Sequence, residues 1–392
     1  MARDSRWLLP DGVDEIIPPH AGMIEHLRRR LLDVIATWGY ALCIPATVEF
    51  LDALVSGGGD DLELQTFKLT DQVSGRLLGI PADMTPQIAR IDAHRINAET
   101  PTRLCYNGPI LHTMPDKFAG SRNPLQLGAE LYGHAGIESD AEVIALMVEV
   151  LAAAGVGEVT LDLGHMGIFH GLAEAAALDA AGEERLLDVL LRKATCELPE
   201  VLAEVQGPAA GWLSALLALN GDTSVLARAK LALSGAPDAV RQAIEDLDAL
   251  VALLTQRCPS LDVHVDLADL RGYRYHTGVM FAAYTLRMGR PIAWGGRYDN
   301  IGARYGRARA ATGFSTDLKL LAALAAVPPA STSAILAPAG SAADLLGAMA
   351  ALRASGQRVI QALPGQAGGA REMGCTSELV LTDGHWVVTT SR

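Results

Sequence analysis

The sequence predicts an α+β protein built on an antiparallel sheet core, with a helical insertion and a small C-terminal α/β unit. Strand-like segments occur in hairpin-like groups with helices between the groups, which favours an antiparallel sheet over alternating βαβ units. An Ala- and Leu-rich stretch from about 167 to 257 interrupts these segments and is typical of helices. A Pro/Ser/Thr-containing run at 327–333 indicates a linker to the last unit.

The totals limit the number of domains and the class of protein. At 392 residues the chain exceeds one ordinary core of about 100–200 residues, and we expect domains at 1–326 and 331–392. The formal charge of −13 argues against binding of RNA or DNA by bulk electrostatics, which requires clustered Lys and Arg. Five separated cysteines without a C-x-x-C pair disfavour a zinc site or disulfide framework and favour a reducing, cytosolic compartment. Apolar runs are short or interrupted, so we expect no signal peptide and no membrane segment.

The first elements are predicted from apolar spacing and glycine positions. Segment 21–38 places apolar residues at helical spacing, which predicts an amphipathic helix that ends at Gly39. An extended run, Tyr40–Phe50, follows the helix. Segments 66–70 and 76–80 are separated by a glycine-containing turn and predict a hairpin.

Local motifs predict the next helices and strands. A proline in its first turn predicts a helix at 85–96, with the threonine at its start as the cap. Strand patterns occupy 103–108 and 124–133. The run Ser139-Asp-Ala-Glu142 matches a capping box at the start of a helix that we expect to reach about Ala154.

Strand patterns return after the helical insertion. We expect strands at 261–267, 279–284 and 312–316, and a helix at 317–325. The last unit shows strand patterns at 334–338, 358–363 and 379–382 and a helical pattern at 341–354. A unit of about 60 residues is only marginally stable alone.

Common catalytic motifs are missing from the sequence. It contains no phosphate-binding glycine loop, nucleophile elbow or H-E-x-x-H site. His165 and His170 are the nearest pair of histidines. A spacing of five turns the second side chain about 140° from the first on a helix, so we expect no metal site there.

Polar residues that interrupt apolar strand patterns are better candidates for functional residues. Gln126 and Glu130 are four residues apart and face the same side of a strand, where a buried glutamate would need a donor or cationic partner. The alternative is a solvent-facing sheet surface. Arg271 lies between strand patterns, either gripping a carboxylate or exposed on a loop. Gly295 and Gly296 indicate either a close approach of the backbone or a hairpin turn.

At these residues the sequence resembles the catalytic core of histidyl-tRNA synthetases, which has a class II aminoacyl-tRNA synthetase fold. The similar segments include 83–90, 103–109, 125–133, 140–145, 163–165, 270–281, 295–299 and 312–321. They follow the family order from about 1 to 325. The similarity is closer still to a non-catalytic paralogue family, the regulatory subunits of ATP phosphoribosyltransferase.

The resemblance implies that the ATP site is degenerate. Two family positions that grip ATP, an arginine and a glutamate of motif 2, are occupied by His112 and Met114. Leu320 stands where motif 3 supplies a second arginine. A neutral imidazole offers neither the fork nor the permanent charge of a guanidinium, so we expect amino-acid adenylation to fail.

The resemblance also implies a histidine-binding pocket that is largely retained. The positions that would hold histidine are Asp83, Thr85, Gln126, Glu130, Arg271, Tyr275 and His276. Two family residues differ, because Arg274 replaces an aspartate and His276 replaces a tyrosine that contacts the ring.

By resemblance, the chain would be a non-catalytic subunit that pairs with a short-form ATP phosphoribosyltransferase in the first step of histidine biosynthesis. It would help to transmit inhibition by histidine, its possible effector. We expect a self-dimer through the first helix and Tyr40–Phe50, and no cofactor. We do not expect tRNA binding, because the chain is acidic and its C-terminal unit is shorter than an anticodon-binding domain. The alternatives are an active histidyl-tRNA synthetase with unusual ATP grips and a free-standing amino-acid sensor.

Overall fold

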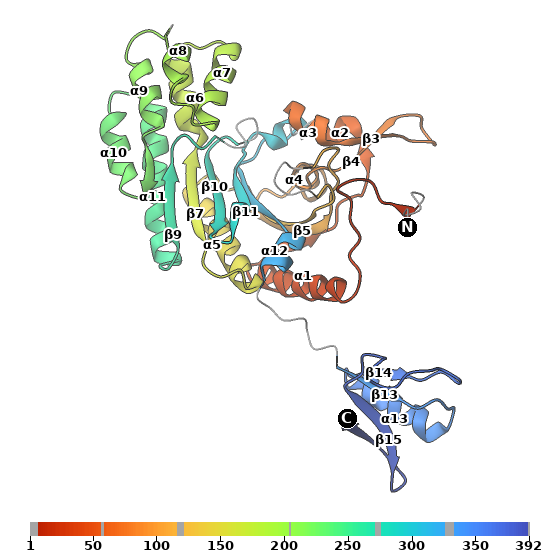
Figure 1. Ribbon diagram of the computed structural model, residues 1–392. Helices are drawn as coiled ribbons and strands as arrows, with labels where there is room; N and C mark the ends of the chain where they lie inside the picture. The colour runs from red at the N-terminus through yellow and green to blue at the C-terminus, as the bar shows by residue number, and fades with distance from the viewer. Residues whose placement is uncertain are drawn as a thin grey trace. The chain divides into compact units, whose positions relative to one another are not determined.

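The computed structural model describes residues 7–55, 59–115, 121–203, 205–270, 276–325 and 333–390, with the backbone alone at 59–61 (Figure 1). The chain divides into two compact units, Met1–Ala326 and Val327–Arg392. Most of the predicted linker at 327–333 lies outside the described residues. None of the helices in the described ranges is long and apolar enough to cross a membrane.

The core of the first unit is a large sheet, in which the described residues form nine strands. In spatial order these are β1 (Ala41–Cys43), β5 (Thr102–Pro109), β6 (Leu125–Tyr132), β12 (Ala311–Asp317), β11 (Met288–Arg297), β10 (Val279–Thr285), β7 (Thr160–His165), β9 (Asp262–Asp266) and β8 (Asn220–Asp222). The pairs β1–β5 and β7–β9 are parallel and the other neighbours are antiparallel. The predicted α+β class with an antiparallel core is therefore confirmed.

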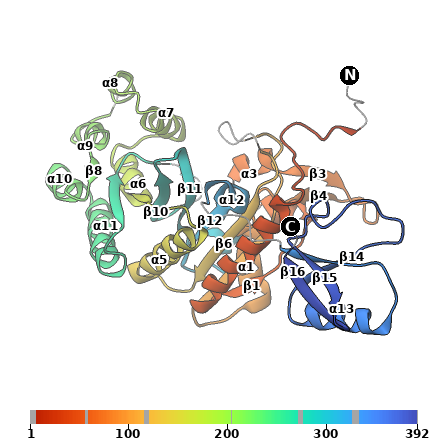
Figure 2. The same cartoon turned by 60° about the horizontal axis from the view of Figure 1, so that its bottom comes forward.

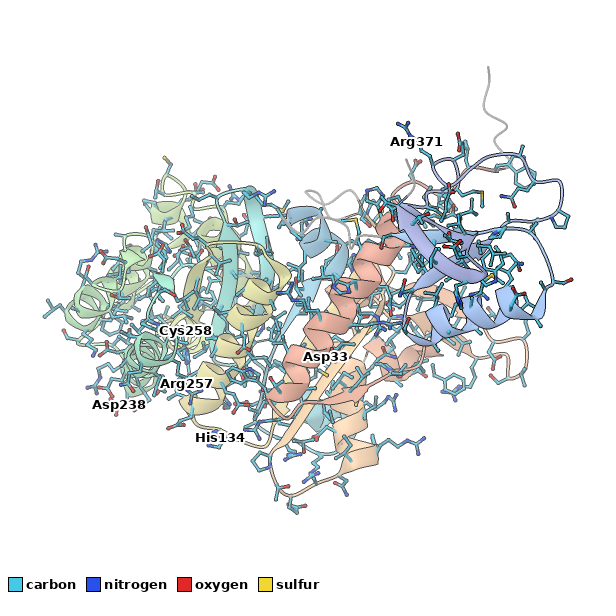
Figure 3. All side chains as sticks on the ribbon, turned by 90° about the horizontal axis from the view of Figure 1, so that it is seen from below. Asp33, His134, Asp238, Arg257, Cys258 and Arg371 are labelled. Carbon is cyan, nitrogen blue, oxygen red and sulfur yellow. The ribbon has the colours of Figure 1, made fainter. Side chains whose placement is uncertain are left out.

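One face of this sheet is covered by helices. They include α1 (His20–Thr37), α5 (Ile137–Ala154), α11 (Asp238–Arg257) and α12 (Leu318–Leu324). Leu27, Leu31 and Ile35 recur at a spacing of four on α1, so their side chains form one stripe that is buried against the sheet and neighbouring helices. Figures 2 and 3 show this face, with α1 and α5 side by side.

The opposite face carries a smaller apolar cluster. It is covered by α4 (Thr85–Ile91), the π-helical turn Asp92–Ile96 and the 3-10 helix Ile301–Tyr305. Next to them lies a three-stranded sheet of β2 (Glu49–Phe50), β4 (Leu77–Ile80) and β3 (Phe67–Thr70), with α2 (Leu51–Val55) and α3 (Gly59–Gln65). The predicted hairpin at 66–80 is confirmed by the β3–β4 pair.

The helical insertion forms one end of the first unit (Figure 1). Its helices are α6 (Met166–Ala175), α7 (Ala180–Leu191), α8 (Leu198–Val201), α9 (Ala209–Leu216), α10 (Val225–Ala232) and α11. The sequence reasoning missed the short strand β8 within it, and also β7 and β11 in the main sheet. β11 contains a proline and two adjacent glycines, residues that normally punctuate strands.

The second unit is a small α/β sheet. Its elements are β13 (Ala334–Ala337), α13 (Ala343–Ala354), β14 (Arg358–Gln361), β15 (Ser377–Thr382) and β16 (His385–Thr390), with strand order β14-β13-β15-β16. β16 was not expected. Most of its side chains are exposed, so its sequence lacks a strong buried-face pattern.

Two predicted helix caps are wrong. Thr85 is the first residue of α4, and its hydroxyl donates to Asp83 instead of capping the helix. At the start of α5 the Ser139 hydroxyl donates to the Gly136 carbonyl, 2.6 Å away. Glu142 forms an ion pair with Arg103 of β5 at 2.7 Å. A charge partner brought near by the fold thus displaces the local capping box.

Candidate functional site

Gln126 and Glu130 lie on β6, on the face of the sheet that α4 covers. Their side chains are buried, with exposed fractions of 6% and 1%. The alternative of a solvent-facing sheet surface is therefore wrong. The burial of a carboxyl group demands hydrogen-bond partners, and the fold supplies them from segments far away in the sequence.

Asp83 joins Gln126 to the start of α4. The Gln126 amide Nε2 donates to Asp83 Oδ1 at 2.8 Å, and Gln126 Oε1 accepts from the Met84 backbone N–H at 2.9 Å. Asp83 Oδ1 also accepts from the backbone N–H and the hydroxyl of Thr85, at 3.0 and 3.1 Å. Both ends of the Gln126 amide are satisfied, so its orientation is fixed.

Two tyrosines continue this network to Glu130. The hydroxyls of Thr85 and Tyr106 lie 3.1 Å apart. Tyr106 then donates to Glu130 Oε1 at 2.9 Å, and Tyr298 donates to the other carboxyl oxygen. Four residues predicted from the sequence, Asp83, Thr85, Gln126 and Glu130, therefore belong to one hydrogen-bond network. The sequence reasoning missed its two tyrosines.

The Glu130 carboxyl group is electrostatically unusual. Burial raises its pKa from 4.5 to about 8, although hydrogen bonds from Tyr298 and Tyr106 act in the opposite direction. The nearby Asp83 carboxylate also raises this pKa. None of these groups supplies positive charge. A cationic group brought beside Glu130 would lower this pKa, because it would stabilise the ionised carboxylate.

Glycines on the neighbouring strands make room for the network. A Cβ on Gly313 would lie 1.5 Å from Glu130 Oε2, and a Cβ on Gly128 would lie 2.4 Å from the Tyr106 hydroxyl. Both glycines are cross-strand neighbours, of Glu130 and Tyr106 respectively. These two positions are therefore restricted to glycine by the side chains that lean over them.

His276 reaches the same face, next to these residues. A Cβ on Gly296 would lie 2.6 Å from the His276 ring, so the ring lies over that glycine. The sheet register aligns Gly296 with Gly313 and Glu130 in one row. Gly295 and Gly296 are inside β11, so close approach is the correct explanation and a turn is wrong. The candidates Arg271 and Tyr275, and the position Arg274, lie outside the described residues.

His112 lies at the end of the same region. Its Nε2 is 2.9 Å from the Ala82 carbonyl, and its backbone forms an isolated bridge with Thr66. The guanidinium of Arg122 is directed to backbone oxygens, those of His112 at 3.0 Å and Asp11 at 3.1 Å. The histidine is therefore part of the protein's own hydrogen-bonding structure.

Met114 and Leu320, the other two positions expected from the resemblance to belong to a degenerate ATP site, carry no charge. Met114 is exposed, with an exposed fraction of 71%, and Leu320 is buried in the main core on α12. A thioether and an isobutyl group offer no fork for a phosphate.

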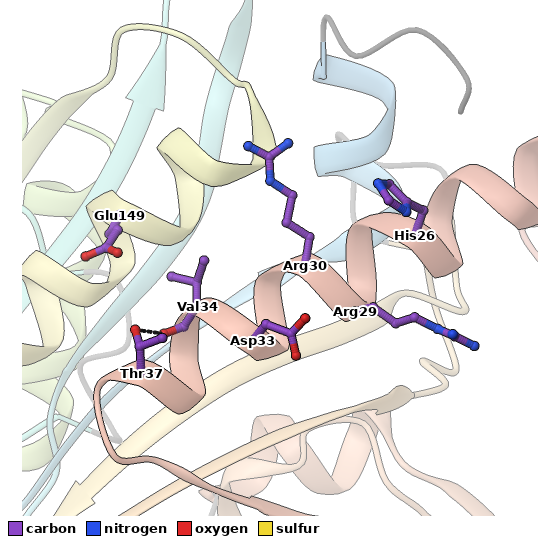
Figure 4. A pocket seen from close by; sticks show the side chains of 7 residues that line it. All are labelled: His26, Arg29, Arg30, Asp33, Val34, Thr37 and Glu149. Atoms are coloured by element: carbon purple, nitrogen blue, oxygen red, sulfur yellow. Dashed lines mark hydrogen bonds between the residues drawn. The ribbon is translucent and has the colours of Figure 1, made fainter. Parts of the chain in front are cut away.

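A separate surface cleft of about 550 Å³ lies along α1, beside α5 (Figure 4). It is lined by His26, Arg29, Arg30, Asp33, Val34, Thr37 and Glu149. These helices cover the sheet face opposite to the Glu130 network, so the cleft is not part of the candidate site. None of the candidate residues that the structure describes lines it.

Potential metal ligands are not grouped in the part of the chain that the structure describes. Among the described residues, no group of three or more His, Cys, Asp and Glu side chains could hold a metal ion. All five cysteines are free. His165 begins α6, where its Nδ1 accepts a hydrogen bond from the Gly167 backbone N–H at 3.0 Å.

Comparison with known proteins places this fold and site in context. A family model described as histidyl-tRNA synthetase matches residues 12–321. A solved structure from Bacillus halodurans, described as an ATP phosphoribosyltransferase regulatory subunit/histidyl-tRNA synthetase, aligns with a TM-score of 0.84 and 26% identity, over 95% of this chain and 97% of that chain. A histidyl-tRNA synthetase from Nostoc sp. PCC 7120 shares the fold at a TM-score of 0.78 and 17% identity, over 98% and 97%. The large unit thus has a histidyl-tRNA synthetase-like, class II fold, as predicted.

Full-length relatives identify the family more closely. The ATP phosphoribosyltransferase regulatory subunit of Thioalkalivibrio sulfidiphilus is 51% identical over 99% of this chain and 100% of that protein. That of Alkalilimnicola ehrlichii is 52% identical over 99% and 98%. A second family model, for the ATP phosphoribosyltransferase subunit HisZ C-terminal domain, matches residues 332–389. The chain belongs to the ATP phosphoribosyltransferase regulatory subunit family.

Proposed function

We propose that the chain is a non-catalytic regulatory subunit that supports ATP phosphoribosyltransferase, the first step of histidine biosynthesis, by assembling with a short-form catalytic chain in the cytoplasm. The observation that carries this proposal is the match to named regulatory subunits over nearly the whole chain. The fold alone would not distinguish this role from synthetase activity, because the same class II core serves both.

The three degenerate positions favour the regulatory role over aminoacyl-adenylate formation. His112 contacts the Ala82 carbonyl, Met114 is exposed, and Leu320 is part of the apolar core. An α-phosphate that becomes more negative in a transition state needs preorganised cationic donors. Side chains of these three kinds supply no permanent positive charge, which supports the absence of catalysis.

Histidine is the effector that we propose for the Glu130 network. The ammonium group and the imidazole ring of histidine are donors, and two carboxyl groups, Asp83 and Glu130, belong to the network. We expect Gln126→Ala and Glu130→Gln to weaken histidine binding measured by calorimetry. Gln72→Ala, on the exposed β3–β4 turn, is the matched control. Unchanged affinity in both pocket variants would place the effector site elsewhere.

A self-dimer through α1 and Tyr40–Phe50 is the second part of the proposed assembly. β1 is the edge strand of the large sheet, so its outer backbone groups are available for pairing with another chain. Large apolar side chains on this segment are exposed, with fractions of 51% at Leu42 and 84% at Ile44. Exposed apolar groups at a sheet edge support an interface. The acidic charge of the chain gives no support to tRNA binding.

Reconstitution tests the proposed function directly. A short-form catalytic chain should gain phosphoribosyltransferase activity when this chain is added, and histidine should then inhibit the mixture. Coupling of about 1–3 kcal/mol would change the apparent affinity for histidine by about 5–150-fold between the assembled and separate states. Absence of any gain would contradict the partner assignment.

A second assay separates the rival activity. Histidine-dependent exchange between ATP and pyrophosphate by the purified chain would show a working synthetase. We expect no exchange above that of a heat-inactivated sample.

A further inference from the structure

The last strand of the second unit leaves one edge of its sheet open. In the strand order β14-β13-β15-β16, β16 has β15 as its one neighbour among the described residues, and Figure 2 shows the two side by side. β16 contains no Pro, Asp, Glu, Lys or Arg. Natural proteins commonly use proline and charged residues to keep edge strands from pairing with another chain. The edge of β16 can therefore accept a further strand.

The turn before β16 determines which of its backbone groups point outward. Asp383 and Gly384 join β15 to β16 with φ angles of 50° and 76°, and the pair Thr382–His385 closes the turn. These values fit the two-residue, type I′ turn typical of Asp-Gly, in which the last residue donates its N–H to the carbonyl of the first. Hydrogen bonding to the neighbour then alternates along an antiparallel strand. The outward backbone groups are therefore those of Trp386, Val388 and Thr390.

The side chains of β16 are also partly uncovered on both faces. Val388 pairs with Leu379 and shares its face, but the buried apolar contacts of α13 are with β13, β14 and β15, and Val388 keeps an exposed fraction of 42%. Val387 points to the other face with an exposed fraction of 38%. On β14, the opposite edge strand, the Val359 carbonyl already accepts a hydrogen bond from Arg353 at 2.9 Å. An open backbone edge and uncovered valines thus occur together at β16.

We propose that β16 pairs in antiparallel orientation with β16 of a second copy of this chain, so that two four-stranded sheets become one sheet of eight strands. A two-fold axis presents the same edge of each copy to the other, so the outward groups of one strand meet those of its partner. Charge also favours this occupant. With a formal charge of −13, two copies repel each other, and an edge without charged side chains is where they approach with the least repulsion.

The pairing is too small to hold two copies together by itself. Six residues from each copy bury much less than the roughly 1,200–2,000 Å² of a standard stable interface. A self-dimer through α1 and β1 would raise the effective concentration of the two second units, because each unit is part of the same chain as its core. In this respect the inference rests on the dimer of the proposed function. Without that dimer, the two strands should separate at the low concentrations used in sedimentation.

Cysteine crosslinking on the full chain tests the pairing. The exposed Cys196 is first replaced by serine, and Val387→Cys, Val388→Cys and Ser355→Cys are then made separately in this background and oxidised with diamide. Ser355 is the matched control, because it is exposed at the end of α13. In the two symmetric registers that pair most of β16, one of the two valines lies opposite its own copy, at a Cα–Cα distance of about 4.5–5.5 Å that suits a disulfide. We expect covalent dimers in that variant and not in Ser355→Cys.

Proline variants separate pairing from folding. Val388→Pro is added to Val387→Cys, or Thr390→Pro to Val388→Cys, whichever crosslinks. Each proline removes an outward N–H and no hydrogen bond to β15, so thermal unfolding should be unchanged while the yield of covalent dimer falls at least about fivefold.

The proposal is overturned if neither valine variant crosslinks more than Ser355→Cys, or if the yield survives the proline. It is also overturned if addition of the catalytic chain abolishes the crosslink, because that chain would then occupy the edge. Sedimentation of the wild type reports the self-dimer separately. A dimer without crosslinks overturns the pairing of β16 alone, and a monomer without crosslinks overturns both.

Discussion

Replacement of Glu130 by glutamine should change how the stability of the protein depends on pH. Burial raises the pKa of Glu130 from 4.5 to about 8, so the folded state holds this proton more tightly than the unfolded state does. Below pH 4.5 the Glu130 carboxyl group does not lower the free energy of unfolding, because it is protonated in both states. As pH rises from 4.5 to about 8 it lowers the free energy of unfolding progressively, and above that pH the loss is constant. Glutamine keeps an oxygen that can accept from the tyrosines but does not ionise.

The size of this effect follows from proton linkage. A shift from 4.5 to about 8 corresponds to an upper limit of about 5 kcal/mol, of which about 4 kcal/mol should develop between about pH 5 and about pH 8.5. The measurement is urea unfolding of the wild type and of Glu130→Gln at both pH values, which gives the free energy of unfolding of each. The variant should gain about 4 kcal/mol relative to the wild type at the higher pH, with a smaller gain if the site relaxes.

Glu142 provides a control with the opposite electrostatics. Burial raises its pKa, but the ion pair with Arg103 outweighs burial, and the net pKa is lowered. The stability that this pair contributes is present above the unfolded pKa and is lost only as pH falls below it. Glu142→Gln should therefore be destabilising by a similar amount at both pH values. Parallel pH profiles for wild type and Glu130→Gln would refute the argument that a buried, protonated Glu130 exists in the folded state.

Three further variants test the fold and the assembly. Gly313→Ala should cost about 1–3 kcal/mol in urea unfolding, because its Cβ would overlap the Glu130 carboxyl group, whereas Gly289→Ala, with open space around it, should be nearly neutral. Arg297→Ala should cost about 3–5 kcal/mol, because it leaves a buried carboxylate of α5 without its partner at 2.7 Å; a loss below 1 kcal/mol would contradict the pairing. Ile44→Asp should shift the chain from dimer to monomer in sedimentation without changing its thermal unfolding, and a persistent dimer would exclude this edge.

The sequence predicted those helices and hairpins whose local pattern is typical of only one kind of secondary structure. Apolar positions at a spacing of four predicted α1, and turn residues between two apolar runs predicted the β3–β4 hairpin. Burial of Gln126 and Glu130 was one of two explanations left open. The sequence of a strand shows which residues share a face, but it does not show whether another element covers that face. The covering helix, α4, is about forty residues away in the chain.

The tyrosines of the site show what strand patterns cannot reveal. Glu130 needed a donor, but Tyr106 and Tyr298 are 24 and 168 residues away in the chain, and only the register across the sheet brings them to it. Gly128 and Gly313 could have indicated that large side chains lie over these strands, because glycines inside strands often mark a close approach. The sequence analysis did not use them.

The charges around the candidate site favour binding of an amino acid over binding of a triphosphate. The acidic side of the site is formed by Asp83 and by Glu130, whose raised pKa keeps its carboxyl group protonated near neutral pH unless a cation stabilises the ionised form. By the resemblance to synthetases, His112, Met114 and Leu320 stand at positions expected to hold ATP. An amino acid brings an ammonium group that Asp83 attracts and that would favour ionisation of Glu130, whereas a triphosphate brings several negative charges that the Asp83 carboxylate repels over about 5–10 Å. A competition experiment should therefore show that excess ATP does not lower the affinity of the Glu130 site for histidine, and strong competition would mean that cationic groups elsewhere control this face.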